Sequence, residues 1–372
     1  MTTRVFIILT LIFSLGIAHA SADDWTLYRG DTAASGRVTG IEKFADRLKI
    51  VWEERLEKGY YAATPIVVGN SIFIGSYDEG MAAFNLQTGK PIWTFRKPEG
   101  WTDITASAAY FEGLVFVGDS DGILHALSAE KGEQKWFFDT KGMIDNSPNI
   151  DVQTKRVIIG SQYGSLFALE AATGKLVWEY ETENMIQCFP TISGRNCFVA
   201  GCDEHLHVVN LDTGKAVCRI PLESPTGSTP LLLGDVAFFG TEGNEFLAVN
   251  WKQEKIIWRF PMRQAVRAPA TYHEGTVIFG GMDKTVYALD AKTGDERWKY
   301  VTKGRIEGGA VIVGNRVYVP SGDSSLHVLD VVTGTRIESK ELSGKLFAAP
   351  AVVPQRIVIA TDEGVLTCLQ EE

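Results

Sequence analysis

Positive charge and long apolar runs are scarce in this sequence. The 372 residues include 36 Lys and Arg against 46 Asp and Glu, a formal net charge of −10, which opposes a general affinity for nucleic acid or anionic lipid surfaces. After residue 22 no apolar run is long enough to span a bilayer. We therefore expect protein or small-molecule partners, no nucleic acid and no transmembrane segment.

Cysteine is also scarce, and the number of cysteines is odd. If residues 191–199 form a hairpin, Ile192 faces Cys197, and Cys188 then lies about 13 Å along the strand, beyond disulfide reach. We expect mostly free, buried thiols. The five cysteines are Cys188, Cys197, Cys202, Cys218 and Cys368.

Residues 1–22 differ in kind from the rest. Arg4 precedes an almost wholly apolar stretch over residues 5–17, and "AHA" and "ASA" follow as small-x-small cleavage sites. This pattern predicts a secretory signal peptide. No cysteine lies near the cleavage sites, so we expect a soluble periplasmic or extracellular protein without a lipid anchor.

An internal repeat dominates the remainder. "LQTGKPIWTF", "AATGKLVWEY" and "AKTGDERWKY" each place a Thr-Gly turn before a tryptophan, and the period of about 41 residues is typical of propeller blades. Two units carry Cys218 and Glu338 where the tryptophan is expected. The repeated tryptophans are Trp52, Trp93, Trp136, Trp178, Trp258 and Trp298.

Each unit reads as four short antiparallel strands joined by tight turns. Eight inner strands can be counted, from Pro65 to Pro350, but only seven outer strands follow them, because the eighth unit stops after its third strand in "VLTCLQEE". The strand around Trp52, residues 48–56, has no partner before it. We therefore predict an all-β, eight-bladed propeller over residues 46–372, closed by this N-terminal strand in the C-terminal blade, with residues 23–45 as a leader.

The repeat core, as in "DGILHALSAEKGEQKW" and "KTVYALDAKTGDERW", resembles the tryptophan-docking repeat of quinoprotein-type propellers and covers residues 48–369. The opening "DDWTLYRGDTAASGR" is similar to the leader of many exported pyrroloquinoline-quinone-like (PQQ-like) propellers. That family contains quinoprotein dehydrogenases, which bind PQQ and usually Ca²⁺, and noncatalytic scaffolds such as BamB of the barrel-assembly machine.

The sequence departs from the dehydrogenase pattern. It has no adjacent cysteine pair, and blades of about 41 residues leave no room for long insertions. We therefore expect no catalytic residues, no metal and no cofactor, with PQQ and calcium as the alternative. The resemblance implies an exported, noncatalytic scaffold that binds protein. The alternative is a minimal quinoprotein oxidoreductase or a small-ligand-binding propeller that uses the funnel mouth.

Three short motifs have structural explanations that we prefer. The run "GDSDG" at Asp119 and Asp121 begins like a calcium loop but lacks the later ligand and glycine, which favours a β-turn. "RGD" at residues 29–31 lies inside the leader. His205 and His207 share one face of a strand and could chelate a metal, but the sequence shows no residue to complete such a site.

The repeated tryptophans are expected to pack between blades, so that the joints at Cys218 and Glu338 should be weaker. Function is expected at one mouth of the channel, where the loops leading into the inner strands converge. These loops carry an aromatic and charged set that suits protein recognition. The candidate rim residues are Tyr61, Trp101, Asp103, Gln187, Arg263, Arg267, Arg305 and Glu307.

Overall fold

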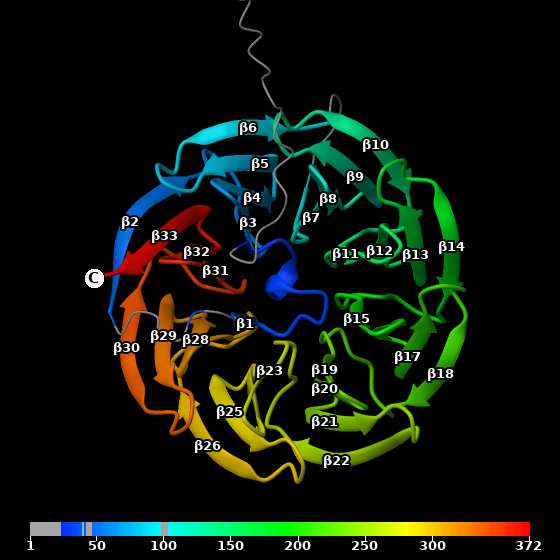
Figure 1. Cartoon of the computed structure of the whole chain (residues 1–372). Helices are drawn as coiled ribbons and strands as arrows, with labels where there is room; N and C mark the ends of the chain where they lie inside the picture. Colours follow the sequence, from blue (N-terminus) through cyan, green and yellow to red (C-terminus); the bar gives the residue numbers. More distant parts are fainter. Residues whose placement is uncertain (1–23, 39–40, 42–46, 98–102) are drawn as a thin grey trace, which may run out of the picture.

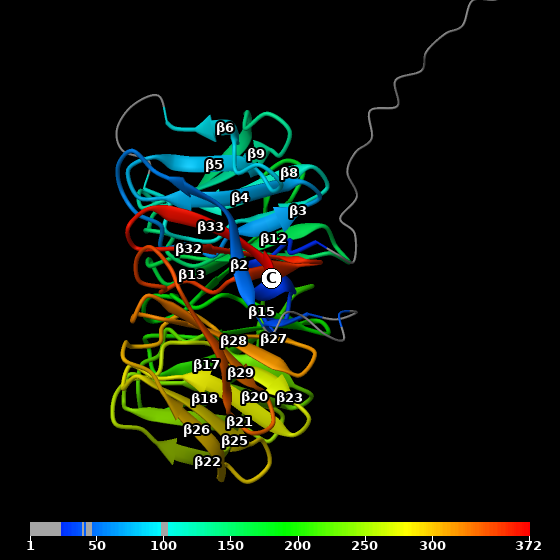
Figure 2. The same ribbon diagram turned by 90° about the vertical axis from the view of Figure 1, so that its left-hand side faces the viewer.

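The computed structural model describes residues 24–38, 41, 47–97 and 103–372; the predicted signal peptide lies outside them. Eight four-stranded antiparallel sheets surround a central axis, and one of them gains a fifth strand from the leader. Figure 1 looks along this axis, and Figure 2 shows the same ring from the side. The predicted eight-bladed all-β propeller is confirmed.

Blades 1 to 4 follow one another along the chain, each running from the innermost to the outermost strand. Their strands are β3 (Ile66–Val68), β4 (Ser71–Ser76), β5 (Gly80–Asn85) and β6 (Pro91–Phe95); β7 (Ala109–Phe111), β8 (Leu114–Gly118), β9 (Ile123–Ser128) and β10 (Gln134–Asp139); β11 (Asn149–Asp151), β12 (Arg156–Gly160), β13 (Ser165–Glu170) and β14 (Leu176–Glu181); β15 (Thr191–Ser193), β16 (Asn196–Ala200), β17 (His205–Asn210) and β18 (Ala216–Pro221).

Blades 5 to 8 repeat the pattern, and the last takes its outer strand from the N-terminal region. Their strands are β19 (Leu231–Leu233), β20 (Val236–Gly240), β21 (Glu245–Asn250) and β22 (Lys255–Pro261); β23 (Thr271–His273), β24 (Thr276–Gly280), β25 (Thr285–Asp290) and β26 (Glu296–Val301); β27 (Val311–Val313), β28 (Arg316–Ser321), β29 (Ser325–Asp330) and β30 (Arg336–Glu341); β31 (Ala351–Val353), β32 (Arg356–Ala360), β33 (Val365–Glu371) and β2 (Leu48–Arg55).

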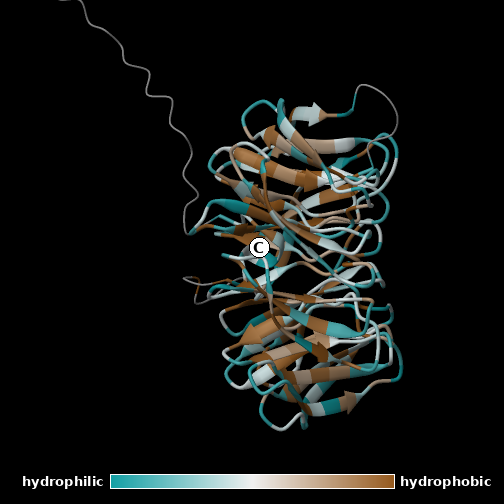
Figure 3. Cartoon of the chain, turned by 90° about the vertical axis from the view of Figure 1, so that its right-hand side faces the viewer, coloured by the Kyte–Doolittle hydropathy of each residue, from teal (hydrophilic) through white to brown (hydrophobic). Residues whose placement is uncertain are grey.

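Burial explains why these segments form strands. The second and third strands of each blade lie between neighbouring blades and are buried on both faces, whereas outer strands such as β14 alternate between exposed and buried positions. In Figure 3 hydrophobic colour follows the strands and hydrophilic colour is frequent in the turns on both sides of the ring.

Closure of the ring is confirmed in detail. β2 pairs antiparallel with β33 from Leu48 opposite Glu371 to Arg55 opposite Val365. The two chain ends are thereby joined in one sheet, which leaves no open gap between the first and last blades.

The repeated tryptophans connect each blade to the next. Trp52 donates its indole N–H to the carbonyl of Leu86 at 2.9 Å, and its ring lies so close to Gly89 that a Cβ there would be 2.7 Å from it. Gly89 also has φ +71°, so the Thr-Gly turn requires glycine for two reasons. The same arrangement recurs with Trp93 on Gly132, Trp136 on Gly174, Trp178 on Gly214, Trp258 on Gly294 and Trp298 on Gly334.

The joint after blade 4 uses a different tryptophan. Cys218 takes the docking position, and the glycine of the next turn is replaced by Glu254, which still has positive φ. Trp251, from blade 5, packs its ring edge-on against Phe198 of blade 4 at 5.4 Å, where other blades pair this phenylalanine with their own tryptophan, as Phe238 does with Trp258. The missing ring is therefore supplied from the opposite side of the joint.

The joint after blade 7 has no Thr-Gly turn to dock on, because the third and fourth strands of blade 8 come from opposite ends of the chain. Glu338 replaces the tryptophan there, and its carboxylate accepts the backbone N–H of Leu48 at 2.8 Å. Partial burial raises the pKa of Glu338. Whether the joints at Cys218 and Glu338 are weaker remains a prediction, but both have replacement contacts.

The leader does not lie outside the ring. Residues 24–38 enter the central channel, with a 3-10 turn η1 (Tyr28–Gly30), and β1 (Arg37–Val38) pairs parallel with β27. Leader carbonyls accept backbone hydrogen bonds from the innermost strands of several blades, each at 2.8 Å. The donors are Val67, Tyr110, Ile192 and Ile312.

The "RGD" tripeptide is inside this channel segment. Arg29 is 0% exposed, and its guanidinium donates to the carbonyls of Ala34 and Ala270 at 2.9 and 2.8 Å. Asp31 caps the following turn by accepting the N–H groups of Ala33 and Ser35. The motif is therefore part of the channel packing rather than a surface tripeptide.

The predicted hairpin and thiols are also seen. Ile192 pairs with Cys197, all five cysteines are free, and Cys188, Cys197 and Cys368 are buried. Burial raises the pKa of Cys188 to about 12, which makes this thiol a poor nucleophile.

Replacing Trp251 by alanine should lower the free energy of unfolding by about 2–3 kcal/mol, below the cost of a fully buried tryptophan because Trp251 is partly exposed. Chemical denaturation measures this. Adding Cys218→Trp should not restore stability, because Glu254 occupies the glycine position, whereas adding Cys218→Trp together with Glu254→Gly should. Unchanged stability of Trp251→Ala would contradict the replacement.

Candidate functional site

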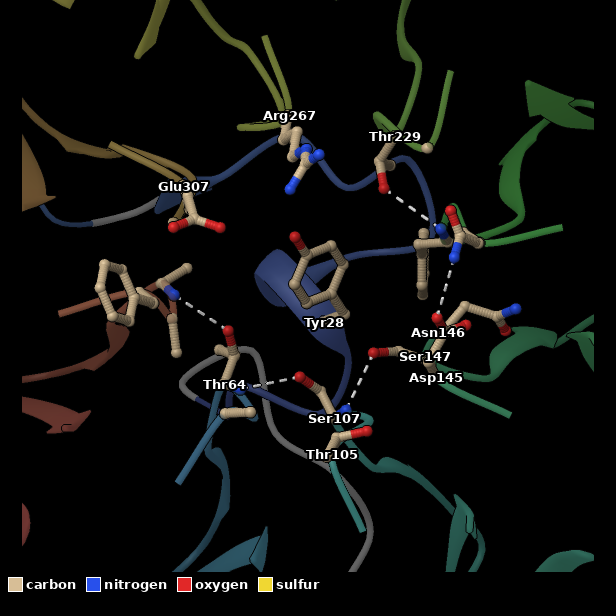
Figure 4. A pocket seen from close by; sticks show the side chains of 18 residues that line it. Tyr28, Thr64, Thr105, Ser107, Asp145, Asn146, Ser147, Thr229, Arg267 and Glu307 are labelled. Carbon is tan, nitrogen blue, oxygen red and sulfur yellow. Dashed lines mark hydrogen bonds between the residues drawn. The ribbon is translucent and has the colours of Figure 1, made fainter. Parts of the chain in front are cut away.

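A polar cavity of about 170 Å³ lies in the channel mouth, above the leader (Figure 4). All eight blades contribute to its wall through the loops that lead into their innermost strands, and Tyr28 of η1 lies at its centre. The lining residues are Tyr28, Ala62, Thr64, Thr105, Ser107, Asp145, Asn146, Ser147, Gln187, Phe189, Gly227, Thr229, Arg267, Glu307, Gly308, Phe347, Ala348 and Ala349.

Hydrogen bonds from backbone N–H groups to side-chain hydroxyls link neighbouring blades along the cavity wall. The backbone N–H of Thr64 donates to the Ser107 hydroxyl at 2.9 Å, and that of Ser107 donates to the Ser147 hydroxyl at 3.1 Å. The N–H of Ala349 donates to the Thr64 hydroxyl at 3.1 Å across the closing joint. These bonds link the wall from blade 8 through blades 1 and 2 to blade 3.

Tyr28 makes the site depend on the leader. Its ring contacts Phe189 at 5.4 Å between centroids, and burial raises the pKa of its phenol. Figure 4 shows its hydroxyl among the wall residues, with Arg267 and Glu307 on one side and Asp145 on the other.

Blade 3 holds two buried side-chain oxygens next to the cavity that have no hydrogen-bond donor among the described residues. One oxygen of Asp145 accepts amide N–H groups from Gln162 at 2.7 Å and Gln187 at 3.4 Å, while the other accepts no hydrogen bond within the described residues. Burial raises the pKa of the Asp145 carboxyl despite these bonds. Asn146, 3% exposed, donates to the Ile186 carbonyl at 2.8 Å, and its own side-chain oxygen accepts nothing from the described part of the chain.

The opposite wall is made of paired charges. The guanidinium of Arg267 donates to both carboxylate oxygens of Glu242, at 2.8 and 3.2 Å, which raises the pKa of Arg267. Arg305 pairs with Glu307 and stacks over the ring of Phe347 at 4.6 Å.

Three predicted rim residues, Gln187, Arg267 and Glu307, line the cavity. Arg305 adjoins it through Glu307, whereas Asp103 and Arg263 are not in the lining. The placement of Tyr61 at the rim was wrong: its side chain is 3% exposed and belongs to the core between blades 8 and 1, because the loop turns its neighbour Tyr60 outward instead. Tyr60 stacks on Tyr77 at 5.0 Å. Trp101 lies outside the described residues.

The residues missed by sequence reasoning are the wall hydroxyls and Tyr28. Thr64, Ser147 and Thr229 each precede the proline that begins an inner strand, and Ser107 precedes the equivalent alanine. This recurring position could have indicated the hydroxyl ring. Tyr28 could not have been found, because nothing in the leader shows that it enters the channel.

The metal-binding motifs considered in the sequence have other contacts. Asp119 accepts backbone N–H groups at Asp121 and Ile123, as in a β-turn, and also contacts Lys97 and His125. Among the described residues, no group of three or more His, Cys, Asp or Glu is placed to hold a metal ion.

The two histidines do not form a chelate. Both ring nitrogens of His207 are engaged, Nδ1 with the Tyr180 hydroxyl at 2.9 Å and Nε2 with Asp203 at 2.9 Å. His205 Nδ1 lies 2.6 Å from the carbonyl of Asp203.

The tryptophan-docked blades and the leader-filled channel define a PQQ-like propeller. A family model described as outer membrane protein assembly factor BamB matches residues 12–137, 136–217 and 283–372, and the chain belongs to this family. The family resemblance inferred from the repeat is confirmed.

Individual relatives include both assembly factors and dehydrogenases. The outer membrane protein assembly factor BamB of Francisella tularensis is 28% identical over 102 residues, which are 27% of this chain and 21% of that protein. The 1-butanol dehydrogenase (cytochrome c) of Thauera butanivorans is 28% identical over 155 residues, which are 38% of this chain and 22% of that protein. The chain therefore matches less than a quarter of that relative's length.

Solved structures show the same division. BamB from Moraxella catarrhalis matches with a TM-score of 0.73 at 19% identity, over 88% of this chain and 98% of that one. The quinohemoprotein alcohol dehydrogenase from Comamonas testosteroni matches with a TM-score of 0.77 at 16% identity, over 95% and 81%. At these identities the likeness shows the fold alone.

In the part of the chain that the structure describes, no helix has the length and apolar character needed to cross a membrane.

Replacing Asp145 by asparagine should raise the melting temperature at pH 7. Burial raises the pKa of Asp145 in the folded state above its value in the unfolded state, so folding favours the protonated carboxyl. The stabilisation that the protonated form provides at low pH is therefore lost as the pH rises through the pKa of Asp145 in the folded state. The two proteins should therefore converge below about pH 4, the ordinary Asp range. Thermal unfolding at pH 3.5 and pH 7 measures this; a lower melting temperature of the variant at pH 7 would contradict it.

Proposed function

We propose that this chain is an exported, noncatalytic scaffold of the cell envelope that binds a partner protein at the channel mouth. The observation that carries this proposal is the leader in the channel, which leaves a cavity of about 170 Å³, below the roughly 300–1,000 Å³ usual for small-molecule sites. The family description, an outer membrane protein assembly factor, supports the same function.

The rim supports protein recognition. Arg267 and Arg305 are about half exposed, Arg305 lies over Phe347, and the stacked pair Tyr60 and Tyr77 presents a partly exposed aromatic surface. Arginine and aromatic side chains are the residues that most often anchor protein interfaces. Export by the signal peptide is part of the proposal.

A quinone cofactor does not fit the mouth as built. PQQ is a planar tricyclic tricarboxylate, whereas the cavity is small and has the carboxylates of Asp145 and Glu307 in its wall. The lining cation, Arg267, is already paired with Glu242. We propose that this chain acts without a quinone cofactor.

Replacing Arg267 by alanine should reduce capture of the partner from a detergent extract of the source cell envelope at least about tenfold, because an interface anchor is lost. Affinity capture on the purified immobilised chain, followed by mass spectrometry, measures this. Arg297→Ala is the matched control, since Arg297 is a similarly exposed arginine on the outer strand of blade 6, paired with Asp290. Equal capture by the parent chain and Arg267→Ala would count against the mouth as the binding face.

Reconstitution with PQQ and Ca²⁺ tests the alternative. The scaffold proposal expects neither a bound-quinone absorbance nor dye-linked oxidation of alcohols or sugars. Stoichiometric quinone binding with turnover would overturn it in favour of a minimal quinoprotein oxidoreductase.

A further inference from the structure

The loops that lead into blades 4 to 7 carry a charged residue at one equivalent position, two residues after the end of the preceding outer strand. The residues at this position are Glu183, Glu223, Arg263 and Lys303. Blades 4 to 7 are consecutive in the ring (Figure 1). The sign of the charge on the mouth therefore changes from negative at blades 4 and 5 to positive at blades 6 and 7.

In blades 4 and 5 the loop glutamate has a cationic partner in the blade that follows it. Glu183 accepts a hydrogen bond from Arg219 of β18 at 2.8 Å, and Glu223 accepts one from Arg259 of β22, also at 2.8 Å. Each arginine is the residue directly after the docking position of its outer strand. The loop charge and the strand charge therefore neutralise each other in these two blades.

Blades 6 and 7 lack both members of this pair. Arg263 and Lys303 stand in place of the glutamates, and the strand positions are Lys299 and Ser339. Lys299 pairs with Glu296 of its own strand. Within the described chain, Arg263 and Lys303 are both exposed and neither side chain forms an ion pair. Two cations on the mouth are thus left for a carboxylate from outside the chain.

The aspartates of the neighbouring turns are engaged by other groups. Asp283 accepts the Tyr287 hydroxyl at 2.7 Å. Asp323 lies 3.2 Å from Nε2 of His327 and accepts the backbone N–H of Lys303 at 2.9 Å. These carboxylates therefore have partners of their own, and the side chains of the two cations remain accessible to a binding partner.

Three further cations extend this positive surface along the loops into blades 6, 7 and 8. The side chains of Arg267, Arg305 and Lys345 are 53%, 51% and 57% exposed, and each has one carboxylate near it. Together with Arg263 and Lys303 they form what we call the basic arc. Because the whole chain has a net charge of −10, the arc attracts anions only at short range, which favours a short acidic segment over a long polyanion.

The loops that carry the basic arc are held in place without a partner. Each is anchored by a buried apolar residue, and these residues, Val266, Ile306 and Leu346, are at most 1% exposed. Arg305 is also packed over the ring of Phe347 at 4.6 Å. A surface whose backbone is already ordered loses less conformational entropy when it binds.

We propose that the basic arc binds an acidic segment of the partner protein, whose carboxylates pair with Arg263 and Lys303. Phe347 borders the arc and offers the segment an apolar contact. The assignment to a protein partner rests on the proposed function, while the affinity of the arc for carboxylates does not.

The test measures binding of a fluorescein-labelled hexaglutamate peptide to the purified full chain by fluorescence anisotropy. We expect saturable binding that weakens as the salt concentration rises, because salt screens exposed charges. The hexaglutamine peptide with the same label should not bind. The double variant Arg263→Glu, Lys303→Glu should weaken binding of hexaglutamate at least about tenfold, because like charges then face each other.

A second double variant separates the position of the charges from the net charge. Lys175→Glu, Lys215→Glu changes the net charge by the same amount, on exposed lysines of Thr-Gly turns at the face opposite the mouth, and should bind hexaglutamate like the parent chain. The milder variant Arg263→Gln, Lys303→Gln should lose affinity in the same direction but by less. Melting temperatures close to that of the parent chain show that lost binding is not lost folding.

Three results would overturn the basic arc as the binding site. They are no binding of hexaglutamate by the parent chain, equal binding by the parent and the Arg263→Glu, Lys303→Glu variant, and an equal loss in the Lys175→Glu, Lys215→Glu control. Vesicles of phosphatidylglycerol test a membrane surface instead. If these vesicles bind through Arg263 and Lys303 while hexaglutamate does not bind, the assignment to an acidic protein segment is overturned.

Capture from the envelope extract separates this proposal from the scaffold function. If hexaglutamate binding depends on Arg263 and Lys303 but the parent chain captures no partner, the scaffold function fails and the carboxylate-binding arc stands. If a partner is captured equally by the parent and the Arg263→Glu, Lys303→Glu variant, the scaffold function stands and the assignment of the arc to that partner is overturned. Loss of both peptide binding and capture in this variant supports the full proposal.

Discussion

The contact between a tryptophan of one blade and the glycine turn of the next holds this molecule together. Six joints use it in the same form, with the indole N–H on a carbonyl and the ring against a glycine that can have no Cβ. Because each blade is narrow and exposes its outer strand, neighbouring blades supply most of its buried surface. The ring, the channel and the mouth all follow from repeating this one joint.

The two exceptions show what the joint requires. Tryptophan and glycine disappear together between blades 4 and 5, where Cys218 and Glu254 stand, and Trp251 fills the space from the other side. Between blades 7 and 8 there is no Thr-Gly turn on which a tryptophan could dock. Glu338 of blade 7 instead accepts a hydrogen bond from the backbone of β2, the closing strand. The two joints without the tryptophan and glycine therefore use other contacts, a ring supplied by blade 5 and a hydrogen bond to the closing strand.

The sequence was sufficient for the ring but not for the site. Period, turn residues and the unpartnered strand around Trp52 predicted eight blades and their closure, because these depend on local patterns and on counting. The cavity depends on Tyr28 and on which way each loop turns its side chains. Tyr60 and Tyr61 are adjacent and alike in sequence, yet Tyr61 is buried and Tyr60 exposed, a difference set by tertiary packing that no periodicity records.

The leader has a consequence for the order of events in folding. Residues 24–38 touch inner strands from blade 1 to blade 7, and β2 pairs with a strand more than 300 residues later in the chain. The contacts of these segments with blades 7 and 8 can form only once those blades have been made, and contacts of such long sequence separation form slowly. Until β2 pairs with β33, the backbone hydrogen-bonding groups of β2 and of the edge of β33 have no partner strand. The folding chain therefore passes through a stage in which β2 is unpaired until β33 has formed.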